Sequence, residues 1–547
     1  MVEYPQKGGE DMRRMTTVRT VVLSLVLVLF ACVSFGTLIP PIEILTTTEA
    51  YDPIRYEAGF MIAEEWEKMG FTVSVRPLEF STLLARVGDE QDFDVHILGW
   101  SGRVERLDPQ HFLQTLYGEQ IELGGMNRGG YVNPIYDALF VAQSREFDSE
   151  VRRQLVLELQ EVYTRDNPLD VLFYRDEVNA FNNTTFTNYV VMAGEALYNE
   201  WTPLNIVPLT DKKVLTIGTP QEPDSINPLV STSVWGWKFM RMTYDKLVRL
   251  SPDIEPIPWA AEEIISVDEV TLDIILRSGM TFHDGMPVTV EDVKFTFDYY
   301  IEHDFAYFRS FFYMIEEVEI LADNHVRFKL EEPYAPFVTV TLTQIPILPK
   351  HIWEDIESPT DLTPAQIPTV GSGPFKFDRY DRGEYKRILT FEDHFAADDI
   401  NIDAVEYIIY ADSEGVFTGL ITGEIDMTAW RLEPGQIPLA EREDHVTVVN
   451  VPDFGYYYLT YNLRREPFGN TELRQALSHL IDKNTIIDVL LEGRGEVGTS
   501  VIAPINAYWH NPDVVRYDYN PEIARKILEE AGYRWDAQGR IMYPEGY

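Results

Sequence analysis

Residues 41–75 read PIEILTTTEAYDPIRYEAGFMIAEEWEKMGFTVSV, and this stretch decides the class of fold. Residues 41–45 are mostly apolar, which predicts a buried strand. Apolar residues then recur at helical spacing over 55–69, and Gly70 ends the predicted helix. Residues 71–75 alternate between apolar and polar side chains, as in a second strand. A strand, a helix and a strand of this size indicate a parallel pair with a right-handed crossover, so we expect an α/β fold.

The same kind of pattern continues along the first 200 residues. Residues 93–98 predict a further buried strand. Residues 148–163 predict a long amphipathic helix that ends near Asn167-Pro168, and 171–174 predict another strand. These elements extend the expected α/β region well beyond its first unit.

A second segment begins after a stretch with prolines at 201–213, which predicts a linker. Residues 214–218 predict the first strand of this segment. A helix is expected after Thr289, because Glu291 and Asp292 place negative charge in its first turn, where the helix dipole favours it.

Two further helices are expected near the end of the sequence. One covers 470–491 with Asn470 as its N-cap. The other follows Asn520-Pro521, where proline suits the first helical turn, and stops at Gly532. Both carry apolar stripes that we expect to face a core.

Length and charge limit the class of protein. A chain of 547 residues with 45% hydrophobic side chains is too long for one core, so we expect two or three packed domains. The formal net charge is −44, from 89 acidic and 45 basic residues. This charge repels nucleic acid and anionic membrane surfaces, so neither is expected as a partner.

The first 36 residues have the order of a secretory signal. Three arginines precede an apolar stretch at 21–31 that is interrupted only by Ser24, and small residues follow at Ser34 and Gly36. We therefore expect an extracytoplasmic protein. Cys32, the only cysteine, directly follows the apolar stretch, where a bacterial lipoprotein carries its lipid; lipidation at Cys32 and simple cleavage near Gly36 are the two alternatives. A single cysteine excludes an intrachain disulfide.

Residues 276–293 read LRSGMTFHDGMPVTVEDV, and they closely resemble the signature of the family 5 extracellular solute-binding proteins, the oligopeptide, dipeptide and nickel class. Further stretches resemble the same family in its usual order: 222–228, 371–375, 423–426, 461–462, 474–477, 481–483 and 524–533. The resemblance implies a two-lobed periplasmic-binding-protein-like α/β fold (type II, cluster C-like), with mixed sheets and a cleft between the lobes. Such a cleft closes on its ligand about a hinge.

The order of the two halves differs from that family. Residues 41–195 resemble the family's C-terminal third, yet they precede the region that resembles its beginning. A circular permutation explains this order, since chain termini often lie close together on a domain surface. An incomplete reading of a longer protein with two copies of the C-terminal region is the alternative. The permutation predicts a signal at 1–36, part of lobe II at 41–115, a return to lobe I at 116–200, a linker at the permutation joint at 201–213, lobe I with an extra subdomain at 214–459, and the rest of lobe II at 460–547.

Aromatic side chains are the first candidates for the walls of the cleft, because ligand clefts combine aromatic surfaces with a few orienting polar groups. Core packing is the alternative explanation for each of them. Trp235 and Trp237 stand out, because two tryptophans in a short loop are costly to bury together. Strand alternation sends Tyr456 and Tyr458 to one face and Tyr457 to the other. The full set of aromatic candidates is Trp100, Trp235, Trp237, Trp430, Tyr456 and Tyr458.

Polar candidates follow Trp100. By resemblance, peptide-binding members carry an Asp shortly after this Trp, which neutralises the amino terminus of the ligand, and a later Asp-Pro pair. The pair is present as Asp108-Pro109, whereas the first Asp has no clear counterpart. Glu105 can substitute for it. Arg103 and Arg106 suit a carboxylate or a sugar hydroxyl through their donor forks.

The sequence contains no Gly-x-Ser-x-Gly, P-loop or His-Glu-x-x-His motif. His283-Asp284 is the most tempting pair for catalysis, but it lies inside the family signature and is interpreted as a structural turn. We expect no enzyme activity, no metal site and no cofactor. The predicted function is that of a monomeric solute-binding protein that captures a peptide or oligosaccharide and delivers it to the permease subunits of an ABC importer. A sensory ligand-binding module and a secreted hydrolase are the alternatives.

Overall fold

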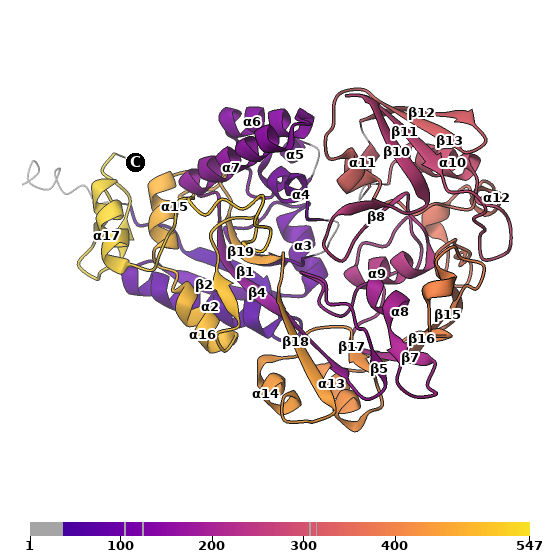
Figure 1. Cartoon of the computed structure of the whole chain (residues 1–547). Coiled ribbons are helices and arrows are strands. Elements are labelled where there is room, and N and C mark those ends of the chain that lie inside the picture. Colours follow the sequence, from indigo (N-terminus) through magenta and orange to yellow (C-terminus); the bar gives the residue numbers. More distant parts are fainter. Residues whose placement is uncertain (1–36, 103–105, 123–124, 306–307, 313, 547) are drawn as a thin grey trace, which may run out of the picture.

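The computed structural model describes residues 37–546, with gaps at 103–105, 123–124, 306–307 and 313. The predicted signal with Cys32 and the site candidates Arg103 and Glu105 lie outside the described residues. The described chain forms two lobes of mixed sheet and helix, which lie side by side (Figure 1). The predicted two-lobed α/β fold is therefore confirmed.

Lobe II is built on a sheet with the strand order β2-β1-β3-β19-β4, and β20 also pairs with β4. β1 pairs in parallel with both β2 and β3, which confirms the predicted strand-helix-strand unit. β19 enters antiparallel between β3 and β4, although it comes from the last hundred residues. The strands are β1 (Ile42–Thr47), β2 (Val73–Leu78), β3 (Val95–Trp100), β4 (Leu169–Asn182), β19 (Tyr456–Tyr461) and β20 (Gly495–Val497).

Helix α2 (Pro53–Met69) joins β1 to β2, and local sequence fixes both of its ends. The Asp52 side chain accepts a hydrogen bond from the Arg55 amide, and Pro53 stands in the first turn, where its missing N–H is not needed. Gly70 has φ +106°, and a Cβ there would lie 2.2 Å from the Gly539 carbonyl oxygen. A larger residue therefore does not fit where this helix ends.

The other helices of lobe II largely follow their predicted caps. α7 starts after Asp148 and α17 after Asn520, as expected. The single helix predicted at 470–491 is wrong, because Asp482 accepts from the Thr485 amide at 3.0 Å and caps a new helix. The helices are α3 (Phe80–Val87), α4 (Pro109–Leu113), α5 (Glu119–Glu122), α6 (Pro134–Arg145), α7 (Ser149–Asp166), α15 (Thr471–Ser478), α16 (Lys483–Leu490) and α17 (Pro521–Glu530).

The two ends of the described chain pack into one core in lobe II. In Figure 1 the indigo β1, β2 and α2 lie beside the yellow α15, α16 and α17. Ile42, Trp66, Leu477 and Leu528 belong to the same buried cluster. The Trp66 indole Nε1 donates to the Leu477 carbonyl at 3.1 Å, and the Ile39 amide donates to the Ile541 carbonyl at 3.2 Å. Segments far apart in the sequence therefore complete this lobe together, next to the hairpin of β21 (Arg534–Trp535) and β22 (Ile541–Met542).

Lobe I holds the rest of the long sheet and a second, four-stranded sheet. The long sheet runs β14-β15-β16-β7-β17-β4, and β18 also pairs with β4. The second sheet has the order β10-β11-β13-β12 and is antiparallel. The strands are β7 (Val214–Thr219), β10 (Ala261–Asp268), β11 (Thr271–Leu276), β12 (Ile315–Ala322), β13 (His325–Leu330), β14 (Phe375–Asp381), β15 (Tyr385–Thr390), β16 (Ala404–Ile409), β17 (Met427–Thr428) and β18 (Val446–Pro452).

Short hairpins and helices complete lobe I. α10 begins with a capping box of Thr289 and Asp292, so its predicted acidic first turn is confirmed. The predicted linker at 201–213 carries α8 and β6, so it is an ordered connection. The remaining β-strands and α-helices are β5 (Phe186–Thr187), α8 (Trp201–Asn205), β6 (Val207–Pro208), α9 (Val234–Thr243), β8 (Val248–Leu250), β9 (Pro256–Pro258), α10 (Val290–His303), α11 (Arg309–Phe312), α12 (Lys350–Trp353), α13 (Ser413–Thr422) and α14 (Ile437–Ala440).

Strand β4 connects the two lobes. It is 14 residues long; its first half pairs with β19 in lobe II and its second half with β18 in lobe I. The preceding helices α6 and α7 pack with β1, β3 and β19, so the chain leaves lobe II within β4 and not at residue 116. The other predicted domain bounds stay predictions.

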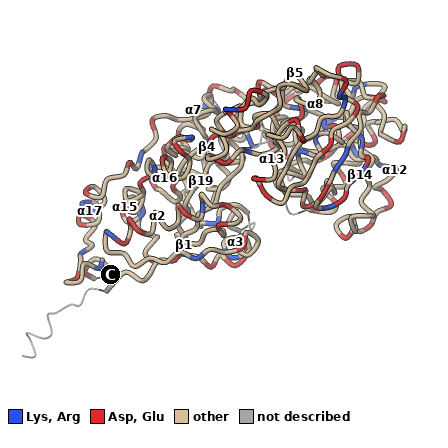
Figure 2. The backbone as a smooth tube through the Cα atoms, turned by 90° about the horizontal axis from the view of Figure 1, so that it is seen from below, with Lys and Arg blue, Asp and Glu red and all other residues tan. Residues whose placement is uncertain are grey.

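Acidic residues are spread over both lobes, with basic residues scattered between them (Figure 2). This distribution is that of a solvated acidic surface. Within residues 37–546, outside the gaps, no helix is long and apolar enough to cross a membrane.

Candidate functional site

Charged side chains from both lobes meet where β4 passes between them. Lobe II contributes two residues from the start of α2, and β4 contributes two more. The loop after β17 (Met427–Thr428) contributes one residue, and the segment between β18 and β19 contributes the last. We call this set the junction cluster, and its members are Asp52, Arg55, Arg175, Glu177, Arg431 and Asp453. All except Asp52 are at least nine-tenths buried. Buried charges are rare unless they are paired or bind a charged group.

On the lobe II side, Asp52 is the centre of the contacts. Its Oδ2 accepts from the Tyr457 hydroxyl at 2.7 Å and lies 3.4 Å from the Arg55 Nη2. Arg175 Nη1 donates to the same Tyr457 hydroxyl at 3.5 Å. Burial acts to raise the pKa of Asp52, but Arg55 and the amide bond that caps α2 outweigh it and lower the pKa. Asp52 is therefore a carboxylate at neutral pH.

On the lobe I side, Arg431 reaches toward lobe II. Its Nε lies 3.6 Å from Glu177 Oε2, and its charge also acts on Asp453 and Asp52. Nε and Nη1 of both Arg55 and Arg431 are buried without a hydrogen-bond partner in the described part of the protein. Guanidinium donors that are buried and unsatisfied favour an acceptor group from a ligand.

Two glycines allow the backbones at this site to touch. A Cβ on Gly102 would lie 1.8 Å from Asp453 Oδ1, and a Cβ on Gly455 would lie 2.0 Å from the Trp100 carbonyl oxygen. The end of β3 is therefore pressed against the segment that leads into β19. This close approach places Trp100 next to the junction cluster.

Asp453 is expected to make the stability of the protein depend on pH. Burial raises its pKa from 3.8 to about 6, against the opposing effect of Arg431 and with the support of Glu177. Between about pH 4 and pH 6 the native state holds a proton that the unfolded chain has released, so stability falls as the pH rises through this interval. The contribution is about 3 kcal/mol, and Asp453→Asn is expected to remove it.

Urea unfolding of the wild type and Asp453→Asn at pH 4 and pH 7 measures this difference. The other acidic residues contribute equally to the pH dependence of both proteins, so their contribution cancels in the difference between wild type and variant. An unchanged pH dependence in the variant would show that Asp453 titrates normally.

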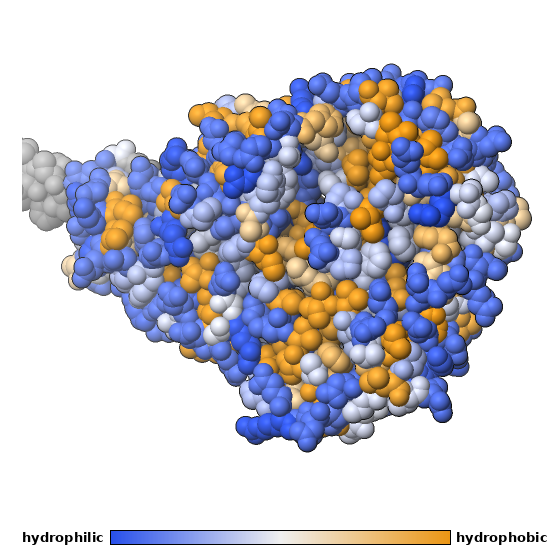
Figure 3. All heavy atoms as spheres, viewed as in Figure 1, coloured by the Kyte–Doolittle hydropathy of each residue, from blue (hydrophilic) through white to orange (hydrophobic). Residues whose placement is uncertain are grey.

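The tryptophan candidates divide into two environments. Trp235 and Trp430 lie together, with ring centroids 5.1 Å apart, on the lobe I side of the junction. Trp237 instead packs in the core of lobe I, with its ring 5.6 Å from Phe308. The two residues lie on helix α9 and not in a loop, and positions two apart on a helix do not share a face. Figure 3 shows hydrophobic residues gathered at the middle of one face, between the lobes.

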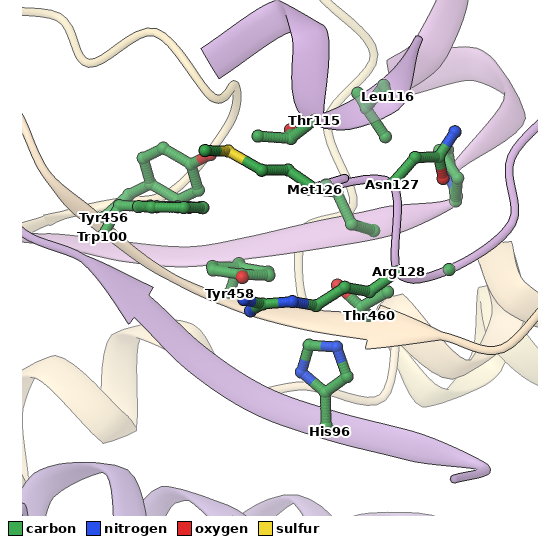
Figure 4. Close-up of a pocket in the computed structure, with 13 residues that line it drawn as sticks. His96, Trp100, Thr115, Leu116, Met126, Asn127, Arg128, Tyr456, Tyr458 and Thr460 are labelled. Carbon is green, nitrogen blue, oxygen red and sulfur yellow. The ribbon is translucent and has the colours of Figure 1, made fainter. Parts of the chain in front are cut away.

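The predicted alternation of the three tyrosines is confirmed, and ligand binding by Tyr456 and Tyr458 stays a prediction. Tyr456 and Tyr458 point to one face of β19 and pack with Phe112 and His96, respectively. Tyr457 points to the other face, where its ring stacks on Phe173 at 4.8 Å. Tyr456 and Tyr458 line a cavity in lobe II together with Trp100 (Figure 4), whereas Tyr457 belongs to the junction.

Asp108 makes a contact between the lobes. Its carboxylate forms a two-point ion pair with Arg152, at 2.6 and 3.0 Å, and also accepts from the Thr339 hydroxyl of lobe I at 2.8 Å. The Ala335 amide donates to the Ser144 carbonyl at 2.8 Å nearby. Asp108 therefore holds the two lobes in contact away from β4, and its side chain does not face the junction cluster.

The His283 side chain has a structural role. Its ring nitrogens bond with the Gly373 carbonyl at 3.0 Å and the Gly371 amide at 3.1 Å, which fastens the signature turn to the 371–373 loop. Burial lowers its pKa to about 4. No group of three or more His, Cys, Asp or Glu side chains is placed to hold a metal ion within the described ranges.

Sequence reasoning missed every member of the junction cluster. Arg431 directly follows the predicted Trp430, and Asp453 lies just before the tyrosine cluster, so proximity to aromatic candidates was a signal for two of them. Asp52 is the N-cap of α2, and no role was predicted for it from the sequence. No sequence pattern points to Arg175 and Glu177 as site residues, because only the course of β4 in the folded chain places them between the lobes.

Known proteins resemble this chain over part of its length. The model of bacterial extracellular solute-binding proteins, family 5 (middle) matches residues 255–545, more than half of the chain. The oligopeptide-binding protein AppA of Bacillus subtilis is 29% identical over 328 residues, which are 58% of this chain and 59% of AppA. The dipeptide-binding protein of Escherichia coli is 26% identical over 342 residues, 58% of this chain and 63% of that protein.

The fold agrees with these matches. The structure of Bacillus subtilis AppA in complex with a nonapeptide has a TM-score of 0.50 and 26% identity, and it covers 61% of this chain and 67% of AppA. The matched part spans about three fifths of the length of the curated relatives. The two lobes, the signature at 276–293 and the family match over 255–545 place the chain in the bacterial extracellular solute-binding proteins, family 5.

Proposed function

We propose that the protein is an extracytoplasmic solute-binding protein that captures a peptide or an oligosaccharide between its lobes and delivers it to the permease subunits of an ABC importer. The observation that carries this proposal is the junction cluster: buried charges of both signs from both lobes, with unsatisfied guanidinium donors on Arg55 and Arg431. The chain acts by binding, as a monomer and without a cofactor.

A peptide fits the junction better than an oligosaccharide. A peptide carries a cationic amine, an anionic carboxylate and backbone amide groups, and the cluster offers carboxylates and guanidinium donors together. Glu177 and Asp453 supply acidic groups in place of the Asp that is absent after Trp100. The names of the relatives, oligopeptide-binding and dipeptide-binding protein, support the same choice.

The contacts that join the lobes away from β4 would allow the lobes to open and close. The Thr339–Asp108 and Ala335–Ser144 hydrogen bonds join the lobes without continuous backbone, so they can break while β4 holds the lobes together. A ligand that touches Arg431 of lobe I and Asp52 of lobe II stabilises the closed arrangement, because only that arrangement brings both groups to it.

We also propose that the order of the two halves is permuted relative to the family. The packing of residues 42–78 against 471–543 in one core supports this, because a permuted chain must complete lobe II from both of its parts. The proposal also includes export from the cytoplasm. The two alternatives for the N-terminal signal are lipidation at Cys32 and simple cleavage near Gly36.

A thermal-shift screen with di- to pentapeptides and oligosaccharides tests the function. A ligand at 100 times its dissociation constant is expected to add about 2.7 kcal/mol of stability. Arg431→Gln is expected to weaken the best ligand at least tenfold, because a charge-assisted bond is lost. Arg442→Gln, on the exposed surface of the same lobe, is the matched control and should bind normally.

Two results would overturn the proposal. One is that no peptide or oligosaccharide stabilises the folded protein. The other is that the purified protein hydrolyses its ligand, which would make it an enzyme.

A further inference from the structure

Apolar side chains from both lobes meet in a small cluster next to the junction. Leu107 follows β3 in lobe II, and Phe454 lies in the segment between β18 and β19. Met192 and Leu250 come from lobe I. We call these four buried residues the interlobe cluster, and Ile505 of lobe II packs against it. Burial of these side chains against each other is lost when the lobes move apart, so the cluster favours the arrangement in which the lobes touch.

Phe454 fixes the place of this cluster between the lobes. A Cβ on Gly194 of lobe I would lie 2.0 Å from the Phe454 ring. A Cβ on Gly102 of lobe II would lie 2.6 Å from the Phe454 amide nitrogen. Only glycine allows such a close approach at either position, so both lobes are in contact with the same residue.

The residue after Leu107 adds a polar contact with lobe I. Asp108 accepts from the Thr339 hydroxyl at 2.8 Å, while Arg152 holds its carboxylate within lobe II. The Asn506 side-chain amide donates to the Leu107 carbonyl at 2.8 Å and fastens this segment to lobe II. Two neighbouring residues of lobe II therefore make an apolar and a polar contact with lobe I.

A strained residue of lobe I packs against the interlobe cluster. Ile254 lies in the turn between β8 and β9 and has φ +71°. A β-branched side chain rarely occurs in this left-handed conformation, which persists only where the surrounding structure enforces it. The turn thus keeps an unfavourable backbone conformation that places an apolar side chain against the cluster.

We propose that the interlobe cluster and the Asp108–Thr339 hydrogen bond form a latch that sets the balance between closed and open lobes, and that Leu107 is a positioning residue for ligand affinity. The latch is formed in the same arrangement in which the junction cluster is assembled, where Arg431 of lobe I acts on Asp52 of lobe II. Apparent affinity rises with the fraction of molecules in the arrangement that binds. The link to affinity rests on the proposed function, whereas the latch itself does not.

The first experiment measures the distance between the lobes in the protein without ligand. Spin labels are attached through Glu158→Cys on α7 and Asp298→Cys on α10, both exposed, in a Cys32→Ser background, and pulsed electron paramagnetic resonance gives the distance distribution. Leu107→Ala is expected to raise the ratio of open to closed molecules about tenfold. Thr339→Val keeps the size of the side chain and removes only its donor, so it should act in the same direction.

Two further variants separate the latch from a general effect on folding. Leu209→Ala is the matched control, because Leu209 is 54% exposed and lies outside the interlobe cluster. Ile254→Gly is expected to open the lobes while the free energy of unfolding stays near that of the wild type, since glycine adopts φ +71° without strain. Wild-type distance distributions in folded Leu107→Ala and Thr339→Val would overturn the latch.

The second experiment tests the link to affinity by calorimetry with the tripeptide Ala-Ala-Ala. Leu107→Ala is expected to weaken its binding about tenfold, and Leu107→Met and Leu209→Ala are expected to bind normally. Longer distances in Leu107→Ala with unchanged affinity would overturn the positioning role and leave the latch. If the wild type does not bind the tripeptide while the distances respond to Leu107→Ala, the proposed function and the positioning role fail and the latch stands.

Discussion

Asp108→Ala is expected to lower the free energy of unfolding by about 3–5 kcal/mol. The carboxylate and Arg152 are both buried, with 4% and 8% of their side chains exposed, and they form a two-point ion pair. Burial acts to raise the pKa of Asp108, but Arg152 outweighs it and lowers the pKa, so the pair is ionic at neutral pH. Removing the carboxylate leaves the guanidinium buried without its counter-charge and leaves the Thr339 hydroxyl without its acceptor.

Denaturant unfolding followed by circular dichroism measures this loss. Asp298→Ala is the matched control, because Asp298 pairs with Lys294 at 2.9 Å on the exposed surface of α10. That control should change stability by less than about 1 kcal/mol. A loss of similar size in both variants would mean that the buried pair contributes no more than a surface pair.

Trp66→Ala is expected to lower the free energy of unfolding by about 3–5 kcal/mol. Trp66 is fully buried on α2, and its indole N–H donates to the Leu477 carbonyl at the other end of the sequence. The substitution leaves a cavity between α2 and α15 and an unpaired carbonyl. It therefore measures how strongly the two parts of lobe II depend on each other.

Phe60→Ala, on the same helix, is the control for Trp66→Ala. Phe60 is 40% exposed, so its loss should change the unfolding free energy by no more than about 1 kcal/mol. If Trp66→Ala were equally mild, the N-terminal unit and the C-terminal helices would not share a core, and the argument for a permuted lobe would fail with it.

Local sequence determined much of the fold. Asp52, Pro53 and Gly70 set the ends of α2, and Asn520 set the start of α17, because caps and turn residues act through neighbouring backbone groups. The alternation in β19 correctly separated Tyr456 and Tyr458 from Tyr457, since successive side chains of a strand point to opposite faces. The signature at 276–293 identified the family.

Only the tertiary structure determined which residues come together in the candidate sites. The junction cluster joins residues from α2, β4, the β17 loop and the segment before β19, and no periodicity links such distant positions. The same holds for the interlobe cluster, which joins Leu107 of lobe II to Met192 and Leu250 of lobe I. The sequence by itself determined short-range elements and family, because these depend on neighbours along the chain. The path of β4 between the lobes decided which charges meet, because burial and pairing depend on contacts that the folded chain alone creates.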